Sequence, residues 1–380
     1  MATEKLSIID ILTNKFYRDF VSAEDQKFFD FVFSKNPSQK MLDELLKIWD
    51  IEVKSAKQAL LLSYLMKDYP ELQFGDGMAS RLEKLLEFYK CKNAELLEYF
   101  SHVGKALNSK GIEPMIFKGA AMKVLRPELS RSMGDVDFLV RPREFDKTIE
   151  ITEQCGFHGI RASHSVDMKT VDNEWALDIH SFFKVDDLEG KNAFKYAEKL
   201  NAGFYKRAKK IKAFDIDCLM PCHEDLFFIV LTNLSKNMTV RTSVDNILFA
   251  LFDLKFLMTK ENFDWEIVFE NIKISGSQEK VRIAAEFIER IVSGFLPQTL
   301  HENIPFKGKV RNYYERVYYD QYHYLDFRQE CHGFLLADAL KKRQLLKYVV
   351  MRLKYQLMRL IRKRPVLIHL YLRGKNAASK

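Results

Sequence analysis

The sequence contains the segment Gly134-Asp135-Val136-Asp137-Phe138-Leu139-Val140, in which acidic and apolar residues alternate. Its alternation of acidic and apolar residues predicts a β-strand, because successive side chains on a strand point to opposite faces. Asp135 and Asp137 then share one face, about 7 Å apart along the strand. Two such carboxylates repel each other unless a cation lies between them, and Mg²⁺ prefers oxygen ligands of this kind together with substrate phosphates. The alternative interpretation is a solvated edge strand with two unrelated acids.

The segment that precedes this strand in the sequence favours a cation-binding site over a solvated edge strand. Residues 111–117 are mostly apolar and predict a short buried strand, which runs through Lys118-Gly119 into a predicted helix over residues 120–125. A glycine turn at the start of a helix presents backbone N–H groups and the positive end of the helix dipole to an anion. Lys118 would add a point charge for a phosphate.

A segment downstream supplies a further acid. Residues 166–171, the turn Asp172-Asn173 and residues 174–180 predict a β-hairpin, in which Asp178 and His180 share one face. Asp178 would then be the third carboxylate of a two-metal site. A shift of the register by one residue would exchange the faces, and Asp172 lies close by. His180 is a candidate general base or a residue that orients Asp178, and Glu174 is a rival base.

Three further residues have two interpretations each. Arg131 could bind a phosphate through two parallel hydrogen bonds, or form a structural ion pair with an acid of its own loop. Gly134 could let the backbone approach a ligand closely, or be an ordinary loop glycine. Asp253 lies in an apolar helical segment, where an unpaired acid is unfavourable. It therefore predicts an ion pair with Arg241 or another base, or a place in an acceptor pocket.

These motifs, in this order along the chain, resemble those of the nucleotidyltransferases of the DNA polymerase β-like superfamily. Within that superfamily they resemble a family of uncharacterised bacterial nucleotidyltransferases. The resemblance covers roughly residues 110–182 and is carried by Phe117-Lys118-Gly119, Arg131, Asp135-Val136-Asp137 and Asp178-Ile179-His180. The broader superfamily has Gly-Ser at the phosphate turn, where this chain has Lys118-Gly119. The resemblance implies transfer of a nucleoside monophosphate from an NTP to a small-molecule, peptide or protein acceptor, with release of pyrophosphate.

The resemblance also implies roles for the site residues. Asp135, Asp137 and Asp178 would hold Mg²⁺, with Mn²⁺ as the alternative, and His180 would join them as a catalytic residue. The NTP would be bound by Lys118, Gly119, Arg131 and Gly134. A hypothesis from a different class is a non-catalytic relative that binds a nucleotide or a membrane and acts as a regulator or scaffold.

The fold class predicted is α+β, a small mixed sheet within a mostly helical chain. Four regions follow from the pattern: an N-terminal helical region (1–108), the nucleotidyltransferase core (109–184), a C-terminal helical region (185–340) and a basic amphipathic tail (341–380). After Phe183 the pattern predicts helices alone.

Charge and hydropathy suggest a location. The formal net charge is +8 over 380 residues, but residues 341–380 contribute +13, which leaves −5 for the remainder. The basic tail also carries an apolar stripe, so residues 341–364 predict contact with an anionic membrane surface rather than nucleic acid. The alternative is a helix that folds onto the protein body. The sequence shows no signal peptide and no apolar run of 18 residues. We therefore expect a cytoplasmic protein, in peripheral contact with the inner membrane face.

Overall fold

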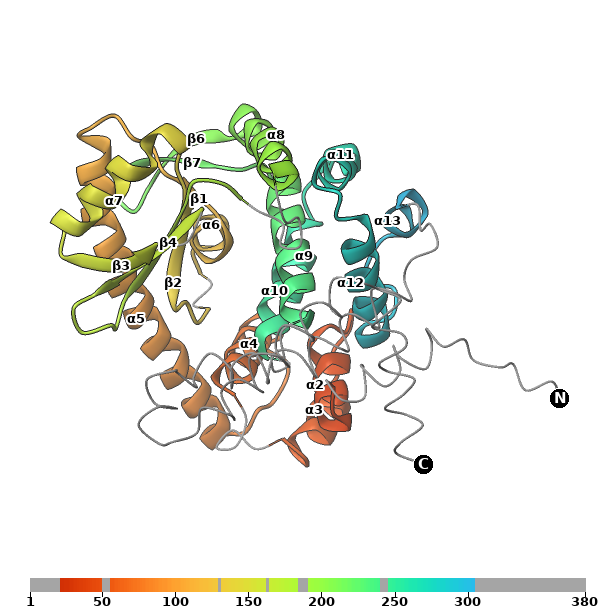
Figure 1. The fold of residues 1–380 in the computed structure, drawn as a ribbon. Coiled ribbons are helices and arrows are strands. Elements are labelled where there is room, and N and C mark those ends of the chain that lie inside the picture. The colour runs from red at the N-terminus through yellow and green to blue at the C-terminus, as the bar shows by residue number, and fades with distance from the viewer. Residues whose placement is uncertain are drawn as a thin grey trace, which may run out of the picture.

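The computed structural model describes residues 21–49, 55–128, 131–161, 164–183, 191–239 and 245–304. Within them, a mixed sheet and its flanking helices pack beside a group of long helices, which confirms the predicted α+β class (Figure 1). The basic tail lies outside the described residues, so its membrane contact stays a prediction. None of the helices in the described ranges is both long and apolar enough to span a bilayer.

The strands of the described residues form one seven-stranded mixed sheet in the order β3-β4-β5-β2-β1-β7-β6. Strands β2 and β5 are parallel, as are β1 and β7, and the other neighbours are antiparallel. Their bounds are β1 Met115–Ile116, β2 Asp135–Leu139, β3 Phe157–Arg161, β4 Ser165–Thr170, β5 Ala176–His180, β6 Lys209–Ala213 and β7 Ile216–Met220.

The acidic strand and the hairpin are confirmed by the structure. Asn173 has a φ of 61°, the left-handed conformation that asparagine tolerates in a turn, and it connects β4 to β5. Strand β1 is shorter than predicted. The expectation of helices alone after Phe183 is wrong, because residues 209–220 form the hairpin β6–β7 that extends the sheet beyond β1. The division of the chain into four regions stays a prediction.

The helices of the described ranges frame this sheet. Ser22, Ser38 and Ser55 cap the first three with side-chain oxygens, as expected for N-cap serines. The bounds are α2 Ala23–Val32, α3 Gln39–Leu46, α4 Ala56–Asp68, α5 Asp76–Asn108, α6 Lys118–Leu125, α7 Phe145–Gln154 (after a 3₁₀ turn, Pro142–Glu144), α8 Lys191–Arg207, α9 His223–Thr239, α10 Asp245–Leu257, α11 Trp265–Ser275, α12 Gln278–Ile291 and α13 Gln298–Asn303.

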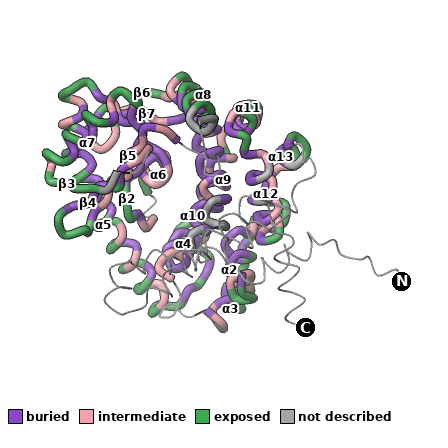
Figure 2. Tube along the Cα trace, in the orientation of Figure 1, coloured by how far each residue is buried: buried purple, intermediate pink, exposed green. Residues whose placement is uncertain are grey.

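The two faces of the sheet have different neighbours. On one face α5 packs against the apolar side chains of β2, with the rings of Phe100 and Phe138 5.4 Å apart, and α7 packs against α5 and β3. Helix α6 lies on β2 and also contacts α9, which packs against α10. The buried residues are concentrated along the sheet and these helices (Figure 2). The acidic face of β2 is thus turned toward α6 and the long helices.

One buried carboxylate on α9 is bound by side chains of two neighbouring helices, α8 and α11. Arg207 of α8 donates from Nε and Nη2 to the two carboxylate oxygens of Asp225 on α9, at 3.0 and 2.6 Å. Asn271 of α11 donates to the same carboxylate at 2.8 Å. Cys222 Sγ donates to the same carboxylate at 3.1 Å. Asp225 is fully buried, so the Arg207 guanidinium compensates its charge and the other donors satisfy its oxygens.

Close packing of α5 on β7 depends on Gly104. A Cβ atom at this position would come within 2.9 Å of Ile216 Cγ2 and closer still to Cδ1, and Ile216 is 1% exposed. We expect Gly104→Ala to lower the free energy of unfolding by about 1–3 kcal/mol through overpacking, measured by urea denaturation.

Gly77 on the same helix is the matched control for this prediction. A Cβ there would meet nothing within 4 Å, so Gly77→Ala should leave the stability unchanged or raise it slightly. Equal stability of Gly104→Ala and the wild type would contradict the packing of α5 on β7.

Candidate active site

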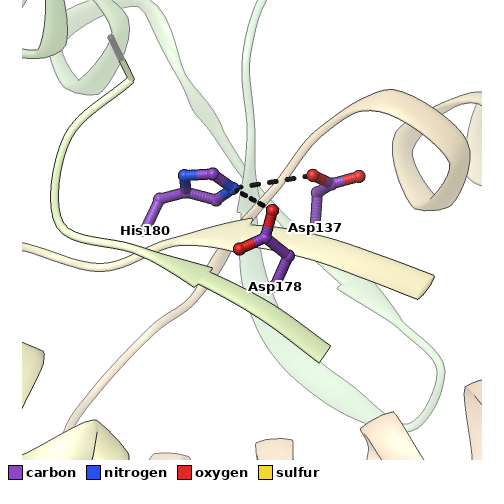
Figure 3. Close-up of side chains that lie close together, drawn as sticks. All are labelled: Asp137, Asp178 and His180. Atoms are coloured by element: carbon purple, nitrogen blue, oxygen red, sulfur yellow. Dashed lines mark ion pairs between the residues drawn. The ribbon is translucent and has the colours of Figure 1, made fainter. Parts of the chain in front are cut away.

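Parallel pairing of β2 with β5 brings the predicted acids together. In this register Asp137 lies opposite Asp178, and Leu139 lies opposite His180. Residues opposite each other on parallel neighbours point to the same face, so Asp137, Asp178 and His180 project from one side of the sheet (Figure 3). The predicted face of Asp178 is therefore confirmed. Asp172 instead accepts hydrogen bonds from Thr170 and the Glu174 amide within the turn.

The three side chains form a compact group of possible metal ligands. One ligand atom from each lies within 4.8 Å of the others. His180 Nε2 is 2.9 Å from Asp178 Oδ2 and 3.6 Å from Asp137 Oδ1. Despite these distances, Nε2 makes no well-aligned hydrogen bond with the described residues. A buried nitrogen placed between two carboxylates in this way marks a position that suits a cation.

His180 is held by aromatic packing. The ring of Phe117, the last residue before α6, lies 5.4 Å from the imidazole. Burial would lower the pKa of His180, but the carboxylates of Asp137 and Asp178 outweigh it and raise the pKa above the ordinary value. The adjacent carboxylates thus favour the imidazolium form of His180.

Lys118 supplies the second positive charge. Its Nζ contacts Asp137 Oδ1. Burial opposes the charged form, yet the negative charge of Asp137 raises the pKa of Lys118 above its ordinary value. The residue has a φ of 50°, an uncommon backbone conformation for lysine that is found at functional sites. This turn places Lys118 at the positive end of α6 and over the acidic face at the same time.

Gly119 is required by crowding at this turn. A Cβ atom on Gly119 would lie 3.1 Å from Met133 Sδ, so the Met133 side chain would have to shift by a few tenths of an ångström. By contrast, a Cβ on Gly134 would meet nothing within 4 Å, as expected of an ordinary loop glycine. A role for either residue in NTP binding stays a prediction.

Asp135 and Asp137 lie in different environments although they share a strand. Asp137 is 4% exposed. Burial opposes its charged form, but Lys118 and His180 override this and hold the pKa of Asp137 below its usual range. Asp135 stands at the exposed end of β2, outside the compact group. Loss of hydration, followed by the negative charge of Asp137, raises the pKa of Asp135 to about 6.

Arg131 is anchored by α10 rather than by its own loop. Its Nη1 donates to Asp253 Oδ2, and its guanidinium lies 5.0 Å from the centre of the Phe249 ring. The predicted ion pair of Asp253 is confirmed, with Arg131 as the partner. Burial raises the pKa of the Asp253 carboxyl, and the Arg131 guanidinium opposes that rise.

Asn93 is a residue of the site that the sequence analysis missed. From the middle of α5, its Nδ2 donates to the Arg131 carbonyl at 2.5 Å, and its Oδ1 accepts from the Met133 amide at 3.4 Å. It is 1% exposed and fixes the loop in front of β2. An isolated polar residue on the buried face of a long helix was the available signal.

Glu174 is not close to the carboxylates. It precedes β5 and lines a separate cavity with Trp175 and residues of α5, the helix on the opposite face of the sheet. Of the two rival bases, only His180 contacts Asp137 and Asp178.

Comparison with known proteins identifies the chain. Residues 48–293 match the model of a family described as uncharacterised nucleotidyltransferase. The chain belongs to this family. A solved structure described as the antibiotic-resistance factor ANT(2'')-Ia is similar over 53% of this chain and 98% of its own, with 11% sequence identity and a TM-score of 0.34. No curated protein matches.

The acidic face of this nucleotidyltransferase thus brings carboxylates, a lysine and a helix N-terminus together. Carboxylates attract a divalent cation, and the cation and Lys118 both attract phosphate oxygens. In the structure the same carboxylates contact Lys118 and His180.

The two acids of β2 should affect stability in opposite directions. The folded-state pKa of Asp135, about 6, lies above the ordinary value of about 3.9. Ionised Asp135 therefore destabilises the fold above about pH 6 and has no effect below about pH 4. Asp135→Asn should raise the melting temperature in EDTA at pH 8 but not at pH 4.

Asp137→Asn should instead lower the stability at pH 8. It removes the negative charge that faces Lys118 and His180, a loss of about 1–3 kcal/mol for a charged hydrogen bond. Asp167→Asn on the exposed surface of β4 is the control. Equal shifts of the melting temperature for Asp135→Asn and Asp137→Asn in differential scanning calorimetry would contradict the opposite effects predicted for these two acids.

Proposed function

We propose that this nucleotidyltransferase transfers a nucleoside monophosphate from an NTP to a small-molecule, peptide or protein acceptor with release of pyrophosphate. The observation that carries the proposal is the register of β2 and β5, which sets Asp137 beside Asp178 next to Lys118 at the start of α6. Hard oxygen ligands and a phosphate-binding group are what such a transfer needs.

The donor set fits Mg²⁺, with Mn²⁺ as the alternative. Asp137 and Asp178 supply oxygen atoms, Asp135 adds a third carboxylate from the same face of β2, and His180 Nε2 has no aligned hydrogen-bond partner among the described residues. Carboxylate-rich sites suit Mg²⁺ and Mn²⁺. When bound, the metal would lower the proton affinity of the acceptor oxygen and neutralise charge on the phosphates.

Lys118 would hold the leaving phosphates. Its ammonium already lies at the acidic face, and the N-terminus of α6 adds backbone N–H groups and the positive end of a helix dipole. In phosphoryl and nucleotidyl transfer the protein acts mostly by positioning and by stabilising charge. The Lys118 turn would thus take the place of the superfamily's Gly-Ser turn.

His180 would act chiefly as a positioning residue. It contacts both carboxylates, is packed against Phe117, and has a pKa raised by the adjacent acids. Two carboxylates that favour the protonated imidazole make it less suited to accept a proton from an acceptor hydroxyl. The acceptor hydroxyl would therefore lose its proton to solvent or to a carboxylate in the metal-bound site.

Loss of either carboxylate, Asp137 or Asp178, should weaken metal binding at the site. We expect Asp137→Asn and Asp178→Asn to weaken Mn²⁺ binding at least tenfold, measured by electron paramagnetic resonance, and to abolish Mg²⁺- and NTP-dependent pyrophosphate release over an acceptor panel. Metal binding is measured separately because the identity of the acceptor does not affect it.

Asp167→Asn is the matched control for these carboxylates. Asp167 pairs with Asp178 in the β4–β5 register but is exposed and lies 3.6 Å from Lys169. It should retain both metal binding and turnover. Wild-type Mn²⁺ affinity in Asp137→Asn and Asp178→Asn would overturn the metal assignment.

Removal of the Lys118 charge should weaken NTP binding. A lost charged contact costs about 1.5–3 kcal/mol, so Lys118→Ala should reduce the affinity for a non-hydrolysable NTP roughly ten- to a hundredfold in calorimetric titration. Lys123→Ala, at the other end of α6, is the control and should bind like the wild type. An unchanged dissociation constant for Lys118→Ala would mean that this side chain does not contact the phosphates.

A further inference from the structure

The first residues of β2 are paired on one side of the strand. Among the described residues, β1 pairs with Phe138 and Leu139, whereas Asp135 has its strand neighbour on β5, where it lies opposite Ala176. Asp135 is also the exposed end of the strand. The end of a strand with few backbone partners opens more easily than its centre, so the position of Asp135 depends on the loop in front of it.

Asn93 of α5 anchors this loop from the other face of the sheet. Its Nδ2 donates to the Arg131 carbonyl at 2.5 Å, and its Oδ1 accepts from the Met133 amide at 3.4 Å. One side-chain amide thus holds the backbone on both sides of Ser132. Asn93 is 1% exposed, so its loss would leave buried backbone groups without their partner, which is costly.

The loop is also in contact with α6. Met133 is 5% exposed, and a Cβ on Gly119, in the first turn of α6, would lie 3.1 Å from its Sδ. The loop is therefore packed between the first turn of α6 and the Asn93 side chain. Gly134 is the one residue between Met133 and Asp135, so a shift of the loop would be passed on to the carboxylate.

We propose that Asn93 is a positioning residue for the metal site, which fixes the backbone before β2 so that Asp135 can join Asp137 and Asp178 as a ligand. The proposal rests on the proposed function for the metal. Helix α5 covers the apolar face of β2, so Asn93 acts through the loop and does not touch the ion. Groups that orient metal ligands affect the affinity of the site for its metal.

The test is a double-mutant cycle on the Mn²⁺ affinity of the full chain, measured by electron paramagnetic resonance. Asn93→Ala should weaken Mn²⁺ binding about threefold to tenfold, somewhat less than the loss of a group bonded directly to a ligand. In the Asp135→Asn background the same substitution should change the affinity by less than about twofold, because the ligand that Asn93 positions is gone. Wild-type affinity in Asn93→Ala, or an equal loss in both backgrounds, would overturn the proposal.

Asn108→Ala is the matched control on the same helix. Asn108 Nδ2 donates to the carbonyls of Ile112 and Asp217 at 3.0 and 2.9 Å, and its Oδ1 accepts from the Asp217 amide at 2.8 Å. Asp217 belongs to β7, which β1 separates from β2. Asn108→Ala should lower the melting temperature, as Asn93→Ala does, and keep the wild-type Mn²⁺ affinity. An equal loss of affinity in Asn108→Ala would assign the effect to stability alone and overturn the proposal.

Hydrogen exchange in EDTA tests the loop without metal. In Asn93→Ala the amides of residues 131–135 should exchange faster than in the wild type, while those of β5 keep their protection. Unchanged exchange in the loop would contradict the anchoring role. Should Asn93→Ala not fold, Asn93→Ser takes its place in both measurements, because it keeps a neutral hydroxyl for one of the two backbone groups.

Failure of the proposed function would give a different result. Wild-type Mn²⁺ affinity in Asp137→Asn and Asp178→Asn would remove the metal from the site altogether. Wild-type affinity in Asn93→Ala, in a protein whose Mn²⁺ binding still requires Asp137 and Asp178, would reject the positioning role alone.

Discussion

The repulsion between Asp137 and Asp178 is the constraint on which the site depends. The two carboxylates lie on adjacent parallel strands in direct register, and like charges in such positions destabilise a sheet. Lys118 and His180 compensate them without metal. The left-handed backbone of Lys118, at the start of α6, directs its side chain to the acidic face. The Phe117 ring packs against the imidazole of His180.

The surrounding fold keeps this arrangement fixed. Asn93 from α5 ties the backbone before β2, and Asp253 from α10 holds the Arg131 side chain of the same loop. Two helices on opposite sides of the sheet therefore set where β2 begins, and so where Asp135 stands. The long helices adjoin the site, because residues of α9 and α10 line a cavity that Lys118 also lines.

Sequence reasoning succeeded where the pattern is local. Alternation in residues 134–140 and 174–180 predicted β2 and β5 and the shared face of Asp178 and His180. It missed the hairpin β6–β7, because Lys209–Ala213 is largely exposed and carries three lysines, a weak signal for a strand. It also could not choose the partner of Asp253, 122 residues from Arg131, or place Glu174 on the other side of the sheet. Pairings between distant segments depend on packing that periodicity does not encode.

The most direct test is a crystal structure of the protein with Mn²⁺ and a non-hydrolysable NTP, using anomalous scattering to locate the metal. We expect an anomalous peak bound by Asp137 and Asp178, with Asp135 as a further ligand and the phosphates of the NTP against Lys118. A nucleotide bound elsewhere, or Mn²⁺ coordinated without Asp137 and Asp178, would contradict it.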